Sequence, residues 1–172
     1  MKTGIIETKK GFFEITVAIN GEKKELSVKN DESLLDALRR HGWKGTKKGC
    51  DTGDCGSCAV LLNGRPVLGC LAPAVTAHEG EITTIEGLGS VRAPHPLQVA
   101  FVEAGAVQCG FCIPGMILSS KHLLDRTPNP TEAEIRKALD GNLCRCTGYV
   151  KQVEAVKAAA QKLRGKGKRA RA

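Results

Sequence analysis

The chain of 172 residues contains few aromatic side chains: one tryptophan, one tyrosine and four phenylalanines. Aromatic side chains supply much of the apolar area of a large core, so we expect two small cores instead of one large core. Domains of that size commonly depend on bound metal or on disulfide bonds for stability. The sequence therefore predicts two small domains in which cysteine or metal chemistry contributes to folding.

The sequence also lacks a hydrophobic run that could cross a bilayer or act as a secretory leader. The longest uncharged stretch, residues 104–120, contains glycine, proline and two cysteines and is shorter than the roughly 20 apolar residues of a membrane helix. Charged residues among the first 20 positions interrupt any signal-peptide core. We expect a cytoplasmic protein without a membrane span. In that reducing compartment, clustered cysteines favour metal binding over disulfide bonds.

Acidic residues are missing from the C-terminal end, and this accounts for most of the net charge of +8. Residues 162–172 contain six basic and no acidic residues, whereas residues 11–161 contain 17 of each. We therefore expect a neutral body whose basic ends are solvated, mobile tails, and no nucleic-acid binding. No glycine-rich dinucleotide-binding loop is visible either.

What the chain does contain is eight cysteines in two groups of four. The first cysteine group is Cys50-x4-Cys55-x2-Cys58 followed by Cys70, and the second is Cys109-x2-Cys112 followed by Cys144-x-Cys146. The first spacing matches that of plant-type [2Fe–2S] proteins, in which C-x4-C-x2-C precedes a distant fourth cysteine. Eight thiolates can hold two such clusters with none left over, so the count favours an electron relay.

The loop that carries the first three cysteines also contains Gly49, Gly53 and Gly56. Glycine permits positive φ and close backbone approach, so peptide N–H groups can point at thiolates and bridging sulfides. Such hydrogen bonds stabilise the additional negative charge of a reduced cluster. Structural zinc sites usually combine two close cysteine pairs, so this loop favours [2Fe–2S] over zinc.

The second cysteine group is less specific when it is taken alone. Its two pairs suit a four-cysteine zinc site about as well as an iron–sulfur cluster. A dithiol redox pair at Cys109 and Cys112 is a further alternative, although it leaves the Cys144-x-Cys146 pair unexplained.

The N-terminal half has the pattern of strands around one helix. Strands are expected at residues 12–19, 26–28, 59–62, 65–68 and 82–85. Asn20-Gly21 and Asn63-Gly64 are preferred hairpin turns. A leucine stripe with a cap at Asn30 or Asp31 predicts a helix that ends at Gly42. This order predicts a β-grasp sheet packed on one helix.

The C-terminal half changes to helical periodicity. Helices are expected from Pro96 to Gly105, from Pro114 to about Arg126, from Thr131 to Gly141, and through residues 153–163. Thr131-x-x-Glu134 is a capping box. Four short helices with brief connections predict a four-helix bundle, so the whole chain is expected to be α+β. We expect domains at residues 11–87 and 88–164, followed by a basic tail at 165–172.

Sequences around the second cysteine group resemble a known family. Gln108-Cys109-Gly110-Phe111-Cys112 and the stretch GNLCRCTGY at residues 141–149 resemble signatures of the iron–sulfur subunit of the xanthine oxidase, or molybdenum hydroxylase, family. The first loop resembles the plant-ferredoxin-like domain of that family. The resemblance extends over roughly residues 12–160. It implies a β-grasp, plant-type [2Fe–2S] ferredoxin domain followed by a four-helix-bundle [2Fe–2S]-binding domain.

The same resemblance implies a role for each candidate residue. The first cysteine group would hold a cluster remote from molybdenum, and the second group would hold a cluster close to it. Gln108 would contact the pterin of the molybdopterin cofactor through its side chain, and Cys146 would be the ligand nearest that pterin.

The resemblance also implies partner subunits. A large subunit would hold the molybdenum cofactor and a medium subunit would hold FAD, in a dimer of heterotrimers. Electrons would pass between molybdenum and FAD through the two clusters, towards FAD in hydroxylating members and in reverse in reductive members. This chain would then carry no catalytic residue. Two other interpretations stay open: a free-standing two-cluster ferredoxin that diffuses between partners, and a zinc-stabilised interaction module.

Overall fold

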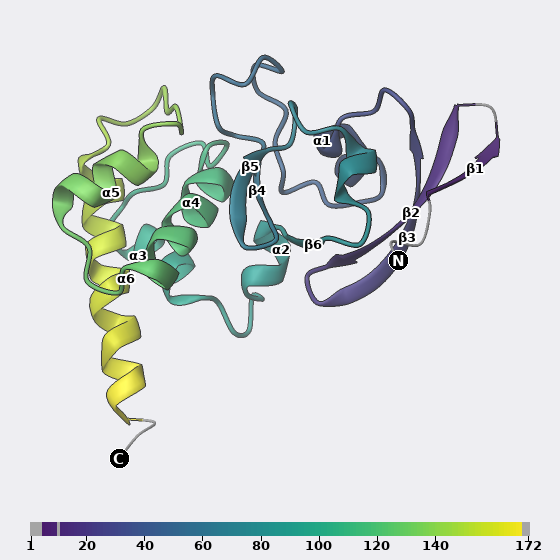
Figure 1. The fold of residues 1–172 in the computed structure, drawn as a ribbon. Helices are drawn as coiled ribbons and strands as arrows, with labels where there is room; N and C mark the ends of the chain where they lie inside the picture. The colour runs from purple at the N-terminus through teal and green to yellow at the C-terminus, as the bar shows by residue number, and fades with distance from the viewer. Residues whose placement is uncertain (1–4, 10, 170–172) are drawn as a thin grey trace.

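The computed structural model describes residues 5–9 and 11–169. It has an α+β fold, with a mixed sheet and one helix in the N-terminal half and a bundle of helices in the C-terminal half (Figure 1). The strands are β1 (Ile6–Lys9), β2 (Phe12–Ile19), β3 (Glu22–Lys29), β4 (Ala59–Leu62), β5 (Arg65–Leu68) and β6 (Glu81–Thr83). The helices are α1 (Leu34–Arg40), the 3-10 turn η1 (Ala74–Ala77), α2 (Ile85–Leu88), α3 (Pro96–Glu103), α4 (Ile113–Arg126), α5 (Glu132–Leu139) and α6 (Val150–Arg169).

The strands form one sheet in the order β1-β2-β6-β4-β5, with β3 paired to β2 as well. β2 and β6 run parallel, and the other pairs are antiparallel. Both expected hairpins are confirmed. Asn20 and Gly21 have φ of 54° and 84°, and Asn63 and Gly64 have φ of 51° and 73°, which are the left-handed conformations that a two-residue type I′ turn requires.

Helix α1 packs its leucines on the buried face of this sheet. Leu34 and Leu38 share a core with Ile15 and Val17 of β2. The expected cap at Asn30 or Asp31 is wrong, because the Ser33 hydroxyl accepts the hydrogen bond from the backbone N–H of Asp36 instead, at 3.1 Å. The turn after β3 is therefore longer than the sequence suggested.

The four expected helices of the C-terminal half are present as α3 to α6. Their shared core is apolar and includes Phe101, Met116, Ile135 and Val156. The capping box at α5 is confirmed: the Thr131 hydroxyl accepts from the N–H of Glu134, and the Glu134 carboxylate accepts from the N–H of Thr131. These helices pack into the bundle on the left of Figure 1.

One expected strand is shorter than predicted. β6 ends at Thr83, and Ile85 begins the short helix α2. The cause lies at Thr84, whose N–H donates to the Asn20 side chain at 2.8 Å instead of continuing the sheet ladder. Ile85 and Leu88 then pack against the helical core. Helix α2 therefore spans the predicted domain boundary between residues 87 and 88 and contacts the helical half on both sides of it. That boundary stays a prediction.

The two ends of the chain contain more regular structure than expected. β1, inside the predicted N-terminal tail, pairs with the start of β2. Helix α6 continues through Arg169, so most of the predicted tail at 165–172 extends that helix beyond its neighbours (Figure 1). Residues 170–172 lie outside the described residues. Within the described part of the chain, no helix combines the length and the apolar character needed to cross a membrane.

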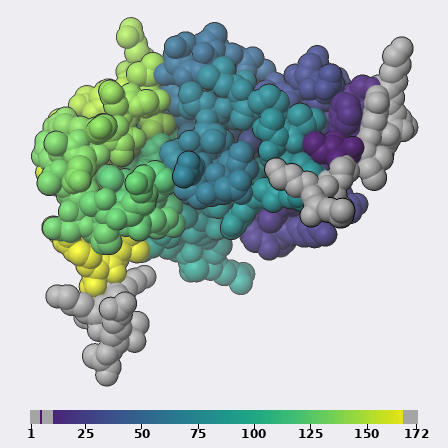
Figure 2. Space-filling model, viewed as in Figure 1, coloured from purple at the N-terminus to yellow at the C-terminus, as the bar shows by residue number. Residues whose placement is uncertain are grey.

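The two halves are in direct contact. Helix α4 of the bundle lies against β4 and β5 of the sheet, and Figure 2 shows the helical half abutting the sheet half on the visible face. A hydrogen bond between His122 Nδ1 and the carbonyl oxygen of Gly64, at 2.8 Å, joins α4 to the second hairpin turn. The contact brings the loops that carry the two cysteine groups next to each other.

Candidate metal centres

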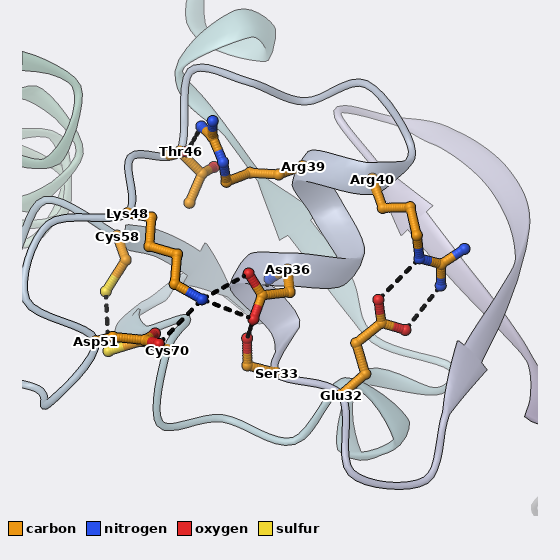
Figure 3. A network of polar contacts seen from close by, with 10 residues as sticks. All are labelled: Glu32, Ser33, Asp36, Arg39, Arg40, Thr46, Lys48, Asp51, Cys58 and Cys70. Carbon is orange, nitrogen blue, oxygen red and sulfur yellow. Dashed lines mark hydrogen bonds and ion pairs between the residues drawn. The ribbon is translucent and has the colours of Figure 1, made fainter. Parts of the chain in front are cut away.

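The first cysteine group lies in the loop between α1 and β4, and Cys70 follows β5. Figure 3 shows Cys58 and Cys70 side by side, with their sulfurs 3.4 Å apart. Cys58 is buried, whereas the other three thiols of this group are partly exposed. The first group therefore combines one buried and three partly exposed cysteines.

Backbone N–H groups converge on the Cys50 sulfur. Thr52, Asp54 and Cys55 donate to it with N···S distances of 3.4, 3.3 and 3.4 Å. Hydrogen bonds from the Thr52 side chain and from the N–H groups of Thr52 and Cys55 lower the pKa of Cys50 to about 6. Cys50 thus favours the thiolate, which is the form that binds metal. The expected cradle of peptide donors is present here.

The loop adopts this shape through several left-handed residues. Asp51, Gly53 and Gly56 have φ of 63°, 90° and 70°. Gly49 serves another purpose, because a Cβ added there would lie 2.6 Å from the Cys55 sulfur. Two of the three expected glycines therefore provide backbone conformation, and the third provides space for a sulfur.

Charged residues tie the loop to α1 (Figure 3). The Lys48 ammonium lies 3.1 Å from an Asp36 carboxylate oxygen on α1 and 3.0 Å from a carboxylate oxygen of Asp51 in the loop. Partial burial raises the pKa of Asp36, but hydrogen bonds from Lys48 and Ser33 outweigh it and lower that pKa overall. This network fixes the start of the loop against the helix.

The second cysteine group lies in two connections that involve four helices. Cys109 and Cys112 lie between α3 and α4, and Cys144 and Cys146 lie between α5 and α6. The sulfurs of Cys109 and Cys146 are both exposed and 3.5 Å apart. Burial, together with a hydrogen bond to Cys144, raises the pKa of Cys112 to about 12. The four thiols thus approach each other as an exposed pair and an inner pair.

The pairwise arrangement bears on the kind of metal that fits. Among residues 5–9 and 11–169, no three Cys, His, Asp or Glu side chains gather around the position of a single metal ion, and the sulfurs that come close do so in twos. In a [2Fe–2S] cluster each of the two irons takes two cysteine thiolates, and the close pairs Cys58–Cys70 and Cys109–Cys146 match that pairing.

Cys144 has a hydrogen-bonded environment of its own. The Thr147 hydroxyl donates to the Cys144 sulfur at 3.1 Å, and the Cys144 N–H donates to the Tyr149 hydroxyl at 2.7 Å. Partial burial raises the pKa of Cys144, but hydrogen bonds, first among them that from Thr147, outweigh it and lower that pKa. The Gln152 side chain in turn donates to the Thr147 hydroxyl at 2.9 Å.

Gln108 is exposed beside the exposed pair of Cys109 and Cys146. Among residues 5–9 and 11–169, no hydrogen bond to the Gln108 side chain is seen. The side chain is therefore accessible at the surface next to Cys109.

The loops of the two cysteine groups meet in a seam. The N–H of Leu143 donates to the carbonyl oxygen of Cys55 at 2.9 Å. The Asn142 amide donates to the carbonyl oxygen of Gly56 at 3.1 Å and accepts from the Ser119 hydroxyl at 2.9 Å. One hydrogen bond thus connects a residue of the first group to the residue that precedes Cys144 of the second.

The eight cysteines were predictable, but three polar residues that support them were not. Asn142 is 3 % exposed and Gln152 is fully buried, while Thr147 contacts a sulfur. A signal for Gln152 was available, because it is a polar residue within the apolar stripe of α6, next to Val153. Asn142 carried no such signal, since its partners are distant in sequence.

Comparisons with known proteins agree with this geometry. Residues 17–82 match the family model "2Fe-2S iron-sulfur cluster binding domain", and residues 84–157 match "[2Fe-2S] binding domain". The nicotinate dehydrogenase small FeS subunit of Eubacterium barkeri is 48% identical over 149 residues, which cover 86% of this chain and 95% of that protein.

Solved structures are similar as well. The crystal structure of quinoline 2-oxidoreductase from Pseudomonas putida 86 contains a chain with a TM-score of 0.86 and 40% identity, covering 90% of this chain and 98% of that chain. The aldehyde oxidoreductase of Desulfovibrio gigas gives a TM-score of 0.85 and 42% identity, covering 89% of this chain but 17% of that longer chain. With both domain models in the same order and relatives of matching length, the chain belongs to the small iron–sulfur subunits of the molybdenum hydroxylase family.

Proposed function

We propose that this chain is the two-cluster electron-transfer subunit of a heteromeric molybdopterin-dependent oxidoreductase. It relays electrons between a molybdenum cofactor on a large subunit and FAD on a medium subunit, in a dimer of heterotrimers. Substrate conversion takes place on the molybdenum subunit, and this chain supplies no catalytic residue. It works in the cytoplasm, where eight unbridged thiols stay reduced.

Each cysteine group holds one [2Fe–2S] cluster. The ligands are Cys50, Cys55, Cys58 and Cys70 for the first cluster and Cys109, Cys112, Cys144 and Cys146 for the second. A bound [2Fe–2S] cluster supplies reversible one-electron transfer. The chain positions the thiolates in pairs, with sulfurs 3.4 Å apart at Cys58 and Cys70 and 3.5 Å apart at Cys109 and Cys146, and directs peptide donors at Cys50.

The seam between the two loops is the observation that carries this proposal. The Cys55 carbonyl accepts a hydrogen bond from Leu143, whose neighbour is Cys144. A path of covalent bonds and one hydrogen bond of 2.9 Å therefore links a ligand of each cluster. Two unrelated metal sites in separate domains would have no need for such a connection, whereas a relay depends on close and rigid spacing.

Exposure supports an assignment of which cluster faces which partner subunit. Gln108, Cys109 and Cys146 lie together at the surface of the helical half, so this edge is available to a pterin held by the large subunit. Gln108 contacts that pterin through its amide, and Cys146 is the ligand nearest to it. The first cluster then faces the FAD subunit.

The test begins with the purified chain. Four irons and four inorganic sulfides per chain and two distinguishable [2Fe–2S] EPR signals on reduction are expected. A colourless chain with stoichiometric zinc would refute the proposal. Co-purification with a flavoprotein and a molybdopterin protein separates a subunit from a free-standing ferredoxin, which would purify alone.

A pair of variants of the assembled complex tests the direction of the relay. Cys146→Ser is expected to disturb both the second cluster and the EPR signal of molybdenum. Cys55→Ser is expected to abolish flavin reduction and leave the molybdenum site able to bind substrate. Equal loss of molybdenum in both variants would overturn the assignment of the two ends.

A further inference from the structure

We propose that Gln152 is a positioning residue that sets the reduction potential of the second cluster. It acts through Thr147: the buried amide of Gln152 holds the Thr147 hydroxyl so that this hydroxyl donates to the Cys144 sulfur. The inference rests on the proposed role of Cys144 as a cluster ligand.

The geometry forms an unbroken chain of donors. The Gln152 Nε2 lies 3.0 Å from the carbonyl oxygen of Ala106 and 2.9 Å from the Thr147 Oγ1, and this oxygen lies 3.1 Å from the Cys144 sulfur. An amide nitrogen carries two hydrogens, so Nε2 serves both acceptors. The Thr147 oxygen then accepts from Gln152, and its single hydrogen is directed to the sulfur.

The orientation of the amide is determined by its surroundings. A carbonyl oxygen can only accept, so the group beside Ala106 has to be the Gln152 nitrogen and not its oxygen. The Gln152 Oε1 is then left buried without a hydrogen-bond partner among the described residues, the only such side-chain atom found there. Burial of an unpaired polar atom is unfavourable. A leucine would fill this place in the apolar stripe of α6 without that cost, so stability alone does not account for the glutamine.

The effect on the potential follows from charge. One-electron reduction adds negative charge that the coordinating sulfurs share, and hydrogen bonds to those sulfurs favour the reduced state. Without the Gln152 amide, the Thr147 hydroxyl is free to rotate towards other acceptors, and the Cys144 sulfur loses a fixed donor. Removal of either residue should therefore lower the potential of the second cluster and leave that of the first unchanged.

The test is an EPR-monitored redox titration of the full chain with both clusters in place. Thr147→Val removes the hydroxyl at nearly constant shape, and a roughly tenfold fall in the equilibrium constant for reduction is expected, which is about 59 mV for one electron. Gln152→Leu should lower the equilibrium constant for reduction of the same cluster by at least about threefold. Thr147→Ser, which keeps a hydroxyl, should restore a value near that of the wild type.

The double variant separates positioning from packing. If Gln152 acts through Thr147, Thr147→Val combined with Gln152→Leu should shift the potential no further than Thr147→Val alone. Ser120→Ala is the matched control, because the buried Ser120 hydroxyl bonds to the Met116 carbonyl in the same bundle and touches no sulfur. It should leave the potentials of both clusters unchanged.

Three results would overturn the inference. These are an unchanged potential in Thr147→Val with both clusters assembled, an additive shift in the double variant, or equal shifts of both clusters. In each case the proposed relay function would stand. A wild-type chain that bound no cluster would instead refute the proposed function itself. If Gln152→Leu did not assemble, the comparison of Thr147→Val with Thr147→Ser would still decide whether the hydroxyl tunes the cluster.

Discussion

At the scale of single residues, Asn142 has the most consequential position outside the cysteines. Its amide bonds to the Gly56 carbonyl and to the Ser119 hydroxyl, one on each side of the seam. Asn142→Ala removes both hydrogen bonds and leaves the Gly56 oxygen with the N–H of Ala59, at 3.1 Å, as its remaining donor. We expect a loss of about 1–3 kcal/mol in the free energy of unfolding, seen as a fall in melting temperature of roughly 2–4 °C per kcal/mol.

Circular dichroism melting of the cluster-loaded chain measures this loss. Asn129→Ala is the control, since Asn129 is an exposed amide in the loop before α5, and its effect should stay within about 0.5 kcal/mol. Equal destabilisation by the two variants would contradict the role given to Asn142.

Residue identity alone predicted part of the site. Cysteine spacing identified all eight thiols because metal ligands recur at characteristic intervals. Gly53 and Gly56 were predictable because a tight loop around sulfurs requires left-handed backbone. The partners of Asn142 were not, since its contact with Gly56 spans 86 positions and no local pattern records it.

At the scale of helices and strands, the start of α5 offers a direct test of capping. The Thr131 hydroxyl accepts from the Glu134 N–H, and the Glu134 carboxylate accepts from the Thr131 N–H. Thr131→Ala should cost about 1 kcal/mol, with a fall in melting temperature of about 2–4 °C. Thr131→Ser keeps the acceptor and should melt close to the wild type; a drop equal to that of alanine would argue against the cap.

The junction of β3 and α1 should depend on pH. The Glu32 carboxylate, whose side chain is 8 % exposed, accepts two hydrogen bonds from Arg40, at 2.8 and 2.7 Å (Figure 3). Hydrogen bonds from the Arg40 guanidinium lower the pKa of Glu32 from its ordinary value, against a smaller opposing effect of burial. Because the folded pKa is depressed, the stabilisation is complete above the unfolded pKa of about 4.3 and is lost as the pH falls through the folded value.

Glu32→Gln measures this dependence. The variant should melt below the wild type at pH 7 by the equivalent of about 1 kcal/mol, and the difference should narrow progressively below about pH 4. Comparison of the two proteins at each pH removes effects that both share. A difference that stayed constant between pH 7 and pH 3 would rule out the ion pair as its source.

Element boundaries show where sequence patterns fail. The Asn-Gly turns and the α5 capping box are local signals, and each was confirmed. The cap of α1 lies at Ser33 instead of Asn30 or Asp31. All three residues are of types that cap helices, so the sequence alone did not distinguish between them. β6 stops at Thr83 because the Asn20 side chain, far away in sequence, takes the Thr84 N–H.

At the scale of the whole molecule, the closeness of the two halves can be tested through two glycines that share a conformation. Gly56 and Gly64 have φ of 70° and 73°, but a Cβ at Gly56 would lie 2.1 Å from the Gly141 carbonyl oxygen, whereas a Cβ at Gly64 would meet nothing within 4 Å. Gly64→Ala should cost only the left-handed strain, about 1 kcal/mol. Gly56→Ala should cost at least about twice as much, because it also forces the halves apart.

The spin–spin coupling between the two reduced clusters reports the separation directly in EPR. It should weaken in Gly56→Ala and stay unchanged in Gly64→Ala. Unchanged coupling in both variants, with both clusters present, would show that the seam does not set the distance between the sites.

The order of the domains was predictable from the order of the two cysteine motifs, but their contact was not. Hydrophobic periodicity assigns residues to a core within each half, and it carries no information about which loops meet between halves. The hydrogen bond from Leu143 to Cys55 joins segments 88 residues apart, so only the folded chain places the two groups together.

The narrowness of the seam also limits how the sequence can vary over generations. A Cβ on Gly115 would lie 2.5 Å from the Gly56 carbonyl oxygen, and a Cβ on Gly56 would meet Gly141 on the other side. Mutations arise one position at a time, and at either glycine every single replacement introduces an atom where a neighbouring backbone already lies. Descendants of this chain are therefore held to glycine at both positions for as long as selection maintains the spacing between the two cysteine groups.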